Sequence, residues 1–258
     1  MIGKPGRLTV IRRLRKALRF IVGKMVPVWL LESIGPQLVS AKVMSMQGVD
    51  AIKLLMRLDN ELYSVQGYAA LVYGNGVHPK HRLTGYHDFF TDRVAAGATV
   101  LDVGCGNGAV AHDLASRCNA CVLGIDENEA NILYANSKFS HAGVTFAHGR
   151  VPDNLPDREF DVVILSNVLE HIEERVKFLE ALIEATRART FLIRVPLFER
   201  DWRVPLKREL EVDYRLDRTH FIEYTQESFA EEVQNAGLQI THGEVRWGEI
   251  WAQAVSIS

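Results

Sequence analysis

The chain has 258 residues, of which 47% are hydrophobic and 24% are charged, and its 30 lysines and arginines against 32 acids give a formal net charge of −2. These values are typical of a folded globular protein and exclude a disordered chain, a collagen-like fibre and a protein with many membrane spans. The near-zero total hides an asymmetry. Eight basic residues precede the first acid, Glu32, and the rest of the chain carries 22 basic against 32 acidic residues, a charge of −10.

The N-terminal arm, residues 1–36, predicts a basic amphipathic helix. Apolar residues recur every three or four positions over residues 11–25, and cationic side chains occupy most of the other face. Arg19, Lys24 and Pro27 interrupt any apolar window of about 20 residues, so we expect no membrane-spanning helix. The arm also lacks the features of a secretory signal peptide.

Three roles for residues 1–31 stay open. They could contact an anionic membrane surface with Trp29 at the level of the headgroups, bind nucleic-acid phosphates, or dock on the acidic body or on a second subunit of a homodimer. Nucleic acid is the least favoured partner and is not expected, because the acidic remainder of the chain would repel a polyanion.

Residues 37–90 predict a mostly helical extension. A loop rich in glycine and proline, residues 73–82, carries His78 and His81, and Tyr86 opens the next helix. Two interpretations stay open. These side chains are surface or helix-start residues, or the loop borders an active site and His78, His81 and Tyr86 contact the substrate.

The three cysteines, Cys105, Cys118 and Cys121, are too few for a disulfide framework. Cys118 and Cys121 form a C-x-x-C motif, but no second pair completes a tetrahedral zinc site. We therefore expect reduced thiols, no bound metal and a reducing compartment, the cytoplasm.

A glycine-rich turn follows the first predicted strand. Residues 99–103 form a short apolar strand, residues 104–108 read Gly-Cys-Gly-Asn-Gly, and a helix follows to about residue 118. Bare backbone at a helix N-terminus allows a ligand to approach closely. Asp102, just before the turn, would repel a pyrophosphate, which argues against a dinucleotide. Asp126 ends the second strand, residues 121–126, where a carboxylate can accept both ribose hydroxyls.

Together with the run from residue 160 to residue 171, these motifs resemble the class I S-adenosylmethionine-dependent methyltransferases. The resemblance implies an α/β fold with a doubly wound, mostly parallel seven-stranded sheet over residues 91–258, and S-adenosylmethionine as the cofactor. Relatives often place an aspartate after the third strand for the adenine amino group, but Arg150 stands here, so backbone groups at 149–151 or Asp153 would take that contact. The expected cofactor-binding residues are Asp102, Gly104, Cys105, Gly106, Gly108, Asp126, Glu127, Gly149, Arg150, Asn167 and Val168.

The later elements agree with this fold: a helix over residues 174–188, a strand over 190–195, a helix over 225–236 and two edge strands over 238–246 and 251–257. The insertion, residues 197–220, contains Trp202 and is expected to form a substrate lid. The alternative for this insertion is a solvated charged loop.

Two histidines are the candidates for catalysis. His171 follows the fourth strand directly after Glu170, and His220 lies before the helix at 225–236. Histidine suits the removal of a hydroxyl proton because its pKa is near neutral. Glu170 and Trp202 are expected to contact the substrate. The alternatives are a structural role for His171 and a capping or packing role for His220.

The chain lacks an evident RNA-binding domain and an Asn-Pro-Pro-Tyr motif, so a small or lipid-linked acceptor is favoured. We expect O-methylation of a sugar hydroxyl in a cell-surface glycan or glycolipid precursor, as in polysaccharide biosynthesis, by a cytoplasmic enzyme held peripherally at the inner face of the membrane. A quinone-type lipid or another small molecule is the alternative acceptor. A non-catalytic scaffold that binds S-adenosylmethionine at the membrane is the alternative of another class.

Overall fold

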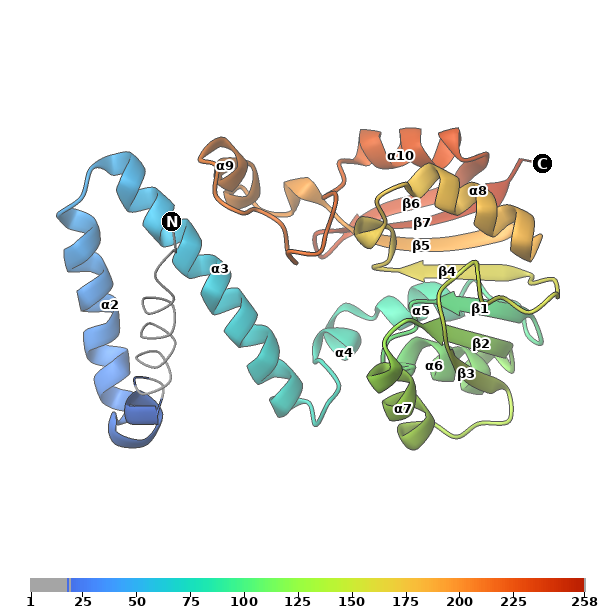
Figure 1. Cartoon of the computed structure of the whole chain (residues 1–258), viewed down its shortest axis with the longest axis horizontal. Helices are drawn as coiled ribbons and strands as arrows, with labels where there is room; N and C mark the ends of the chain where they lie inside the picture. The colour runs from blue at the N-terminus through green and yellow to red at the C-terminus, as the bar shows by residue number, and fades with distance from the viewer. Residues whose placement is uncertain (1–17, 19, 258) are drawn as a thin grey trace, which may run out of the picture. The chain divides into compact units, whose positions relative to one another are not determined.

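The computed structural model describes residue 18 and residues 20–257. The chain divides into two compact units, and the boundary between Asp59 and Asn60 falls within one long helix. Most of the helix predicted over residues 11–25 lies outside the described residues, and its last part, residues 20–25, is helical. Figure 1 shows the helices of the first unit and the sheet of the second.

The described part of the first unit is helical, as predicted. It contains α2 (Val28–Met44) and the start of α3 (Gly48–Tyr73). Helix α2 begins after Pro27, whose fixed φ and missing N–H suit the start of a helix. None of the side chains in α2 is buried, and large apolar ones such as Trp29 (64% exposed) and Met44 (84% exposed) face solvent. The apolar surface of α2 is therefore uncovered within its own unit.

The second unit contains a seven-stranded sheet in the order β3-β2-β1-β4-β5-β7-β6, which confirms the predicted fold. Strand β7 runs antiparallel to β5 and β6, and the other neighbouring pairs are parallel. The strands are β1 (Thr99–Val103), β2 (Cys121–Asp126), β3 (Val144–His148), β4 (Val162–Ser166), β5 (Thr190–Pro196), β6 (Leu238–Arg246) and β7 (Glu249–Ser256).

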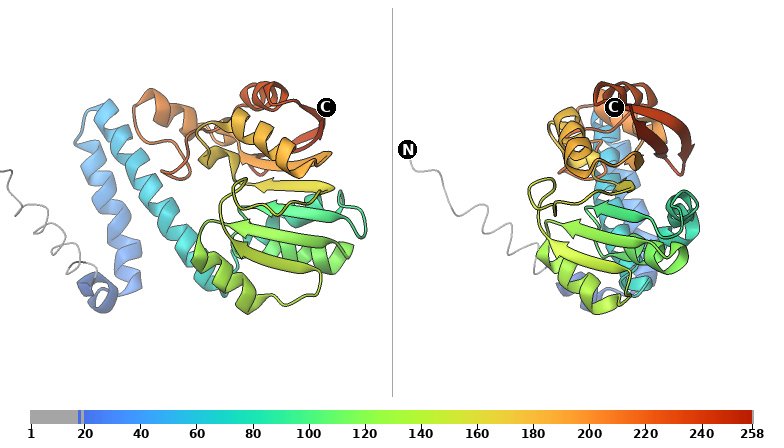
Figure 2. Two further views of the ribbon diagram at one scale, coloured as in Figure 1. Left: turned by 45° about the vertical axis from the view of Figure 1, so that its right-hand side comes forward. Right: turned by 90° about the vertical axis from the view of Figure 1, so that its right-hand side faces the viewer.

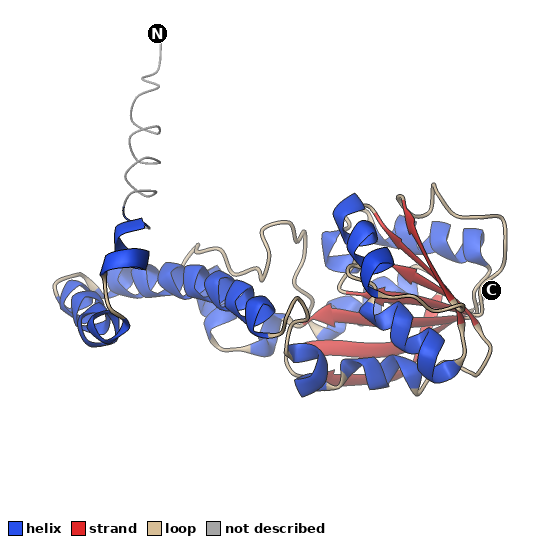
Figure 3. Ribbon diagram, turned by 90° about the horizontal axis from the view of Figure 1, so that it is seen from below, coloured by secondary structure: helices blue, strands red, loops and turns tan. Residues whose placement is uncertain are grey.

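Helices cover both faces of this sheet (Figures 2 and 3). Helices α8 (Arg175–Thr186) and α10 (Gln226–Asn235) share one core cluster with Leu101 and Val103 of β1. Helices α5 (Tyr86–Thr91), α6 (Ala109–Cys118) and α7 (Glu129–Lys138) share the other cluster with Val100. Successive strand residues point to opposite faces, and both faces are buried, which is why the strands read as unbroken apolar runs.

Three short helices were not predicted. Helix α4 (Lys80–Thr84) begins within the expected loop, where Pro79 occupies the N-cap position. The insertion contains a 3-10 turn, η2 (Phe198–Arg200), and helix α9 (Arg203–Glu209). Arg200 holds this insertion in place, because its guanidinium donates to Glu223 at 2.6 Å and to the carbonyl of Tyr214 at 3.0 Å.

In the part of the chain that the structure describes, no helix combines the length and the apolar character that a membrane span requires.

The chain runs from β1 outward to β2 and β3, and then returns to β4 on the other side of β1. The carboxyl ends of β1 and β4 therefore flank the point where the strand order reverses. In open α/β sheets, ligands bind in the crevice at this point. The predicted site residues Gly104–Gly108 and Asn167–His171 follow these two strands directly.

Candidate functional site

The glycine turn after β1 leaves its backbone open. Gly106 has φ +54°, and a Cβ built on it meets no atom within 4 Å. Gly108 has φ +82°, and a Cβ there would lie 2.6 Å from Cζ of Phe146. Both positions favour glycine because of the left-handed backbone. Gly108 is additionally required for packing, whereas the space beside Gly106 is free for a ligand.

Asp126, at the end of β2, connects the second strand to this turn. Its Oδ2 accepts a hydrogen bond from the amide of Gly106 at 2.8 Å, and its Oδ1 accepts from the amide of Asn128 at 2.8 Å and from Nδ2 of Asn131 at 3.1 Å. A carboxylate oxygen has more than one lone pair, so these contacts leave room for further donors. The carboxylate is thus oriented beside the open turn, where a ribose could donate to it.

Two buried oxygens at this crevice have no partner among the described residues: Oδ2 of Asp102 in β1 and Oδ1 of Asn167 after β4. Burial, followed by the neighbouring charge of Asp126, raises the pKa of Asp102 to about 7. Asn167 adopts φ +58°, and its backbone amide donates to the backbone carbonyl of Arg194 at 2.8 Å. Unpaired buried polar atoms are rare in proteins, and a ligand with its own polar groups would provide partners for both.

The expected adenine side follows β3. The amide of Gly149 donates to the carbonyl of Asp126 at 3.1 Å, and the amide of Arg150 donates to Oδ1 of Asn154 at 2.7 Å. The residues Arg150 and Glu127 are exposed. Two of the backbone donors predicted to meet adenine are therefore already engaged inside the protein. Asn154 has a role in this segment that the sequence did not indicate.

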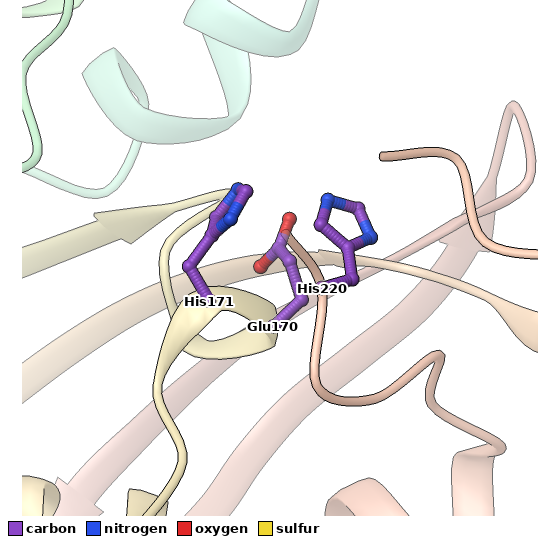
Figure 4. Close-up of side chains that lie close together, drawn as sticks. All are labelled: Glu170, His171 and His220. Atoms are coloured by element: carbon purple, nitrogen blue, oxygen red, sulfur yellow. The ribbon is translucent and has the colours of Figure 1, made fainter. Parts of the chain in front are cut away.

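Glu170, His171 and His220 come together on the other side of the crevice (Figure 4). Each offers one ligand atom, and the three atoms lie within 4.8 Å of one another. Glu170 and His171 belong to the 3-10 turn η1 (Leu169–His171). His220 comes from the end of the insertion, and the amide of the next residue, Phe221, donates to the carbonyl of Glu170 at 2.7 Å.

The hydrogen bonds of the two imidazoles indicate that Nδ1 is the donor in each ring. Nδ1 of His220 lies 2.8 Å from Oε1 of Glu223, and Nδ1 of His171 lies 2.9 Å from Oγ1 of Thr219. The Thr219 hydroxyl donates to Asp217 at 2.7 Å, so it accepts from His171. A carboxylate can only accept, so each Nδ1 carries a proton, and in the neutral ring the lone pair of Nε2 is then left free. Burial, followed by His220, lowers the pKa of His171 and favours this neutral form.

Glu170 is fully buried, and neither of its carboxylate oxygens has a partner in the described structure. Burial raises its pKa to about 8. Its neighbour Arg194 is engaged elsewhere: the guanidinium approaches Glu249 at 3.4 Å and lies 3.6 Å from the ring centre of Tyr86. Sequence reasoning missed Arg194, although an arginine inside an apolar strand is a signal that could have found it.

A second chain of hydrogen bonds links α4, α5 and α6. The hydroxyl of Tyr86 lies 3.0 Å from Nδ1 of His81, this Nδ1 lies 2.9 Å from Nε2 of His87, and Nδ1 of His87 lies 2.7 Å from Asp113. Burial raises the pKa of Tyr86 to about 12, while burial and His87 lower that of His81 to about 4. The sequence singled out His81 and Tyr86 but missed His87 and Asp113.

Two predicted substrate residues lie at helix starts. Nδ1 of His78 accepts from the amide of Lys80 at 3.1 Å, next to the beginning of α4. Trp202 directly precedes α9 and is 69% exposed. This placement agrees with the helix-start alternative for His78. The substrate roles of both residues stay predictions.

Comparisons with known proteins agree on one domain type. Residues 100–189 match the family model described as a methyltransferase domain. The ribosomal protein L11 methyltransferase of Burkholderia lata is 42% identical over 106 residues, which are 39% of this chain and 33% of that protein. A second such enzyme, from Burkholderia vietnamiensis, matches with the same identity and coverage. The chain thus spans about a third of the length of these curated relatives.

Solved structures resemble the fold at low sequence identity. A methyltransferase solved in complex with the Trm112 methyltransferase activator of Haloferax volcanii has a TM-score of 0.58 at 17% identity, covering 74% of this chain and 96% of that chain. A TehB-like S-adenosylmethionine-dependent methyltransferase from Corynebacterium glutamicum has a TM-score of 0.52 at 19% identity, covering 78% of this chain and 99% of that chain.

Proposed function

We propose that this chain, whose residues 100–189 match a methyltransferase domain, is a class I S-adenosylmethionine-dependent methyltransferase that methylates a hydroxyl of a sugar in a glycan or glycolipid precursor. When bound, S-adenosylmethionine supplies a methyl group on a positively charged sulfur, which an oxygen nucleophile can take up. The remaining work of binding, orientation and proton removal falls to the residues of this chain.

One observation supports the cofactor site above the others. The open backbone of Gly106 lies beside the oriented carboxylate of Asp126, and the partnerless oxygens of Asp102 and Asn167 belong to residues at the carboxyl ends of the neighbouring strands β1 and β4. We assign Asp126 to the ribose hydroxyls and Asp102 to a positively charged group of the cofactor. A cationic ligand suits two carboxylates at this edge, whereas a pyrophosphate would be repelled.

We assign the acceptor hydroxyl to the side of the crevice that carries His171 and His220. Because both Nδ1 atoms are held as donors, each Nε2 can accept a hydrogen bond from the hydroxyl. A base at this position removes the hydroxyl proton as the oxygen attacks. The pair could therefore orient the acceptor and receive its proton, with Glu170 and Trp202 as further substrate contacts.

The choice of a lipid-linked sugar rests on the first unit. The exposed apolar residues of α2 follow the eight basic residues of the arm, and this combination suits an anionic membrane surface. A ribosomal protein is not proposed as the acceptor, because the match to the L11 enzymes covers only a third of their length. A quinone-type lipid is the second candidate, since the same membrane contact would serve it.

Purified full-length protein incubated with S-adenosylmethionine and three acceptor panels tests the proposal. The panels are nucleotide sugars, lipid-linked oligosaccharides and reduced quinones. We expect a methyl ether on a sugar, detected by mass spectrometry, and formation of S-adenosylhomocysteine. A methylated quinone would replace the sugar assignment. Calorimetric binding of the cofactor without turnover on any panel would instead favour the non-catalytic scaffold.

A further inference from the structure

We propose that Glu170, His171 and His220 form a binding site for a divalent transition-metal ion, with Zn²⁺ the best match. The sequence alone assigned no metal ligands among these residues. Binding of the ion depends only on the three side chains. Its role in methyl transfer rests on the proposed function.

The three side chains match a known class of metal sites. Catalytic zinc sites use three protein ligands, often two histidines and a glutamate, and keep a further position open. The three ligand atoms here lie within 4.8 Å of one another, and Figure 4 shows the carboxylate of Glu170 between the two imidazoles. Bonds of about 2.0–2.2 Å to one ion would require these ligand atoms to move closer together.

Glu170 supplies a second, independent observation. Its carboxylate is fully buried, and neither oxygen has a partner among the described residues. Burying a charged carboxylate without a partner is costly, so such a group stays protonated unless it is paired or coordinates a metal. The positive charge of Arg194 relieves this cost only in part, because its guanidinium pairs with Glu249 and stacks on Tyr86, and neither Glu170 oxygen receives a hydrogen bond from it. A cation between the imidazoles would provide the missing partner.

The surroundings of both histidines are those of metal ligands. Ligating histidines usually donate their other ring nitrogen to a carboxylate or another acceptor, which fixes the tautomer and the ring. Here Nδ1 of His220 faces the buried Glu223, which is itself held by Arg200 at 2.6 Å and by the amide of Leu216 at 2.7 Å. Nδ1 of His171 faces Thr219, whose hydroxyl donates to Asp217. In each ring Nε2 is left for an ion.

An ion here would alter the chemistry assigned to the two histidines. An acceptor hydroxyl that binds at an open position of the ion becomes more acidic, as water does on zinc. The imidazoles would then hold the ion, and the proton of the acidified hydroxyl would pass to solvent water as the oxygen takes up the methyl group. Activity would therefore depend on the metal, and chelation would reduce turnover without removing the cofactor from its separate site.

The test uses full-length protein with its affinity tag removed, stripped with EDTA and titrated with Co²⁺ alone, then with Zn²⁺ alone. We expect one ion per chain, with the visible absorption of Co²⁺ in a site of four or five ligands. His171→Ala should abolish this absorption. It is the most informative variant because His171 is exposed, so the fold should tolerate its loss. His220→Ala should do the same, and Thr219→Val should weaken binding about 10-fold, as expected for a residue behind a ligand.

His242→Ala is the matched control, because His242 is an exposed histidine whose Nε2 lies 3.6 Å from a carboxylate oxygen of Glu244. It should leave Co²⁺ binding unchanged. Thermal unfolding and S-adenosylmethionine affinity are measured for every variant. Wild-type protein that binds the cofactor but no Co²⁺, or a Co²⁺ signal that persists in His171→Ala, would overturn the metal site and leave the proposed function standing. Loss of cofactor binding in the wild type would count against the function alone.

Discussion

The carboxylate of Asp126 accepts a hydrogen bond from the amide of Gly106 at 2.8 Å, so the end of the second strand is tied to the glycine turn after the first. One residue thus shapes the turn and also presents a carboxylate beside it. A change at Asp126 should therefore affect both the backbone of the turn and the binding of a ribose.

Asp126→Ala is expected to weaken S-adenosylmethionine binding by about 10- to 100-fold, the loss that accompanies one or two hydrogen bonds to a charged group. Isothermal titration calorimetry measures this directly. Glu129→Gln is the control, because Glu129 is an exposed acid three residues further along, at the start of α7, and is not among the expected cofactor-binding residues. Unchanged affinity in Asp126→Ala would refute the ribose assignment.

Substitutions at two glycines should separate stability from binding. Gly108→Ala places a Cβ 2.6 Å from Phe146 at φ +82°, so we expect a loss of about 2–4 kcal/mol in the free energy of unfolding. Gly106→Ala meets no protein atom within 4 Å and should cost only about 1–2 kcal/mol of backbone strain. Its Cβ would enter the space assigned to the cofactor, so binding should fall sharply. Urea unfolding measures the stability of both variants, and calorimetry measures their affinity for S-adenosylmethionine. If the two variants lost the same stability and the same affinity, the assignment of the space beside Gly106 to the cofactor would be wrong.

Asp102 should make stability fall as the pH rises. Its folded-state pKa of about 7 lies above its ordinary value of 3.8, so between these values the folded chain holds more protons than the unfolded chain. Below about pH 4 the ionisation of Asp102 therefore does not reduce the free energy of unfolding. Above about pH 7 it reduces the free energy of unfolding by its full amount, up to about 4 kcal/mol. The free energy of unfolding, measured with urea, should decrease less between pH 5 and pH 8 in Asp102→Asn than in the wild type. Asp153→Asn, at an exposed position, is the control and should retain the wild-type decrease. If the stability of Asp102→Asn depended on pH as that of the wild type does, the buried Asp102 would not be the source of the pH dependence.

Membrane contact through the first unit can be tested with vesicles. Removing residues 1–31 should abolish flotation with vesicles containing anionic phosphatidylglycerol, and raised salt should weaken flotation of the wild type. Trp29→Ala should reduce binding about 10-fold, since Trp29 is 64% exposed and its ring would enter the interface. Trp247→Ala is the matched control at 67% exposure in the second unit. Equal flotation of the two tryptophan variants would argue for docking on protein.

The strands and the position of Asp126 beside the glycine turn were predictable because their signals are local. Apolar runs bounded by turns located the sheet, and the glycine turn with Asp126 follows directly from two adjacent strands. The helix predicted over residues 11–25 lies mostly outside the described residues. Helix α9 was not predicted, because many charged residues in its segment obscure the apolar periodicity of a helix.

The second half of the site was less predictable because its parts are distant in sequence. Glu170 and His171 meet His220 only through the return of the chain after the insertion, and His87 meets Asp113 between two helices. Periodicity reports which face a residue occupies, but it does not report which distant residue shares that face. The burial of a partnerless carboxylate becomes evident only in three dimensions.

The insertion begins and ends at neighbouring points of the domain. Leu197 pairs with Tyr224 in an isolated bridge, and the amide of Phe221 is bonded to the carbonyl of Glu170. A segment whose two ends are fixed side by side can change in length and composition at little cost to the rest of the fold. Natural variation could therefore replace the surface that meets the acceptor while the cofactor crevice is inherited unchanged, and exchange of this single segment between related enzymes offers a route to new acceptors.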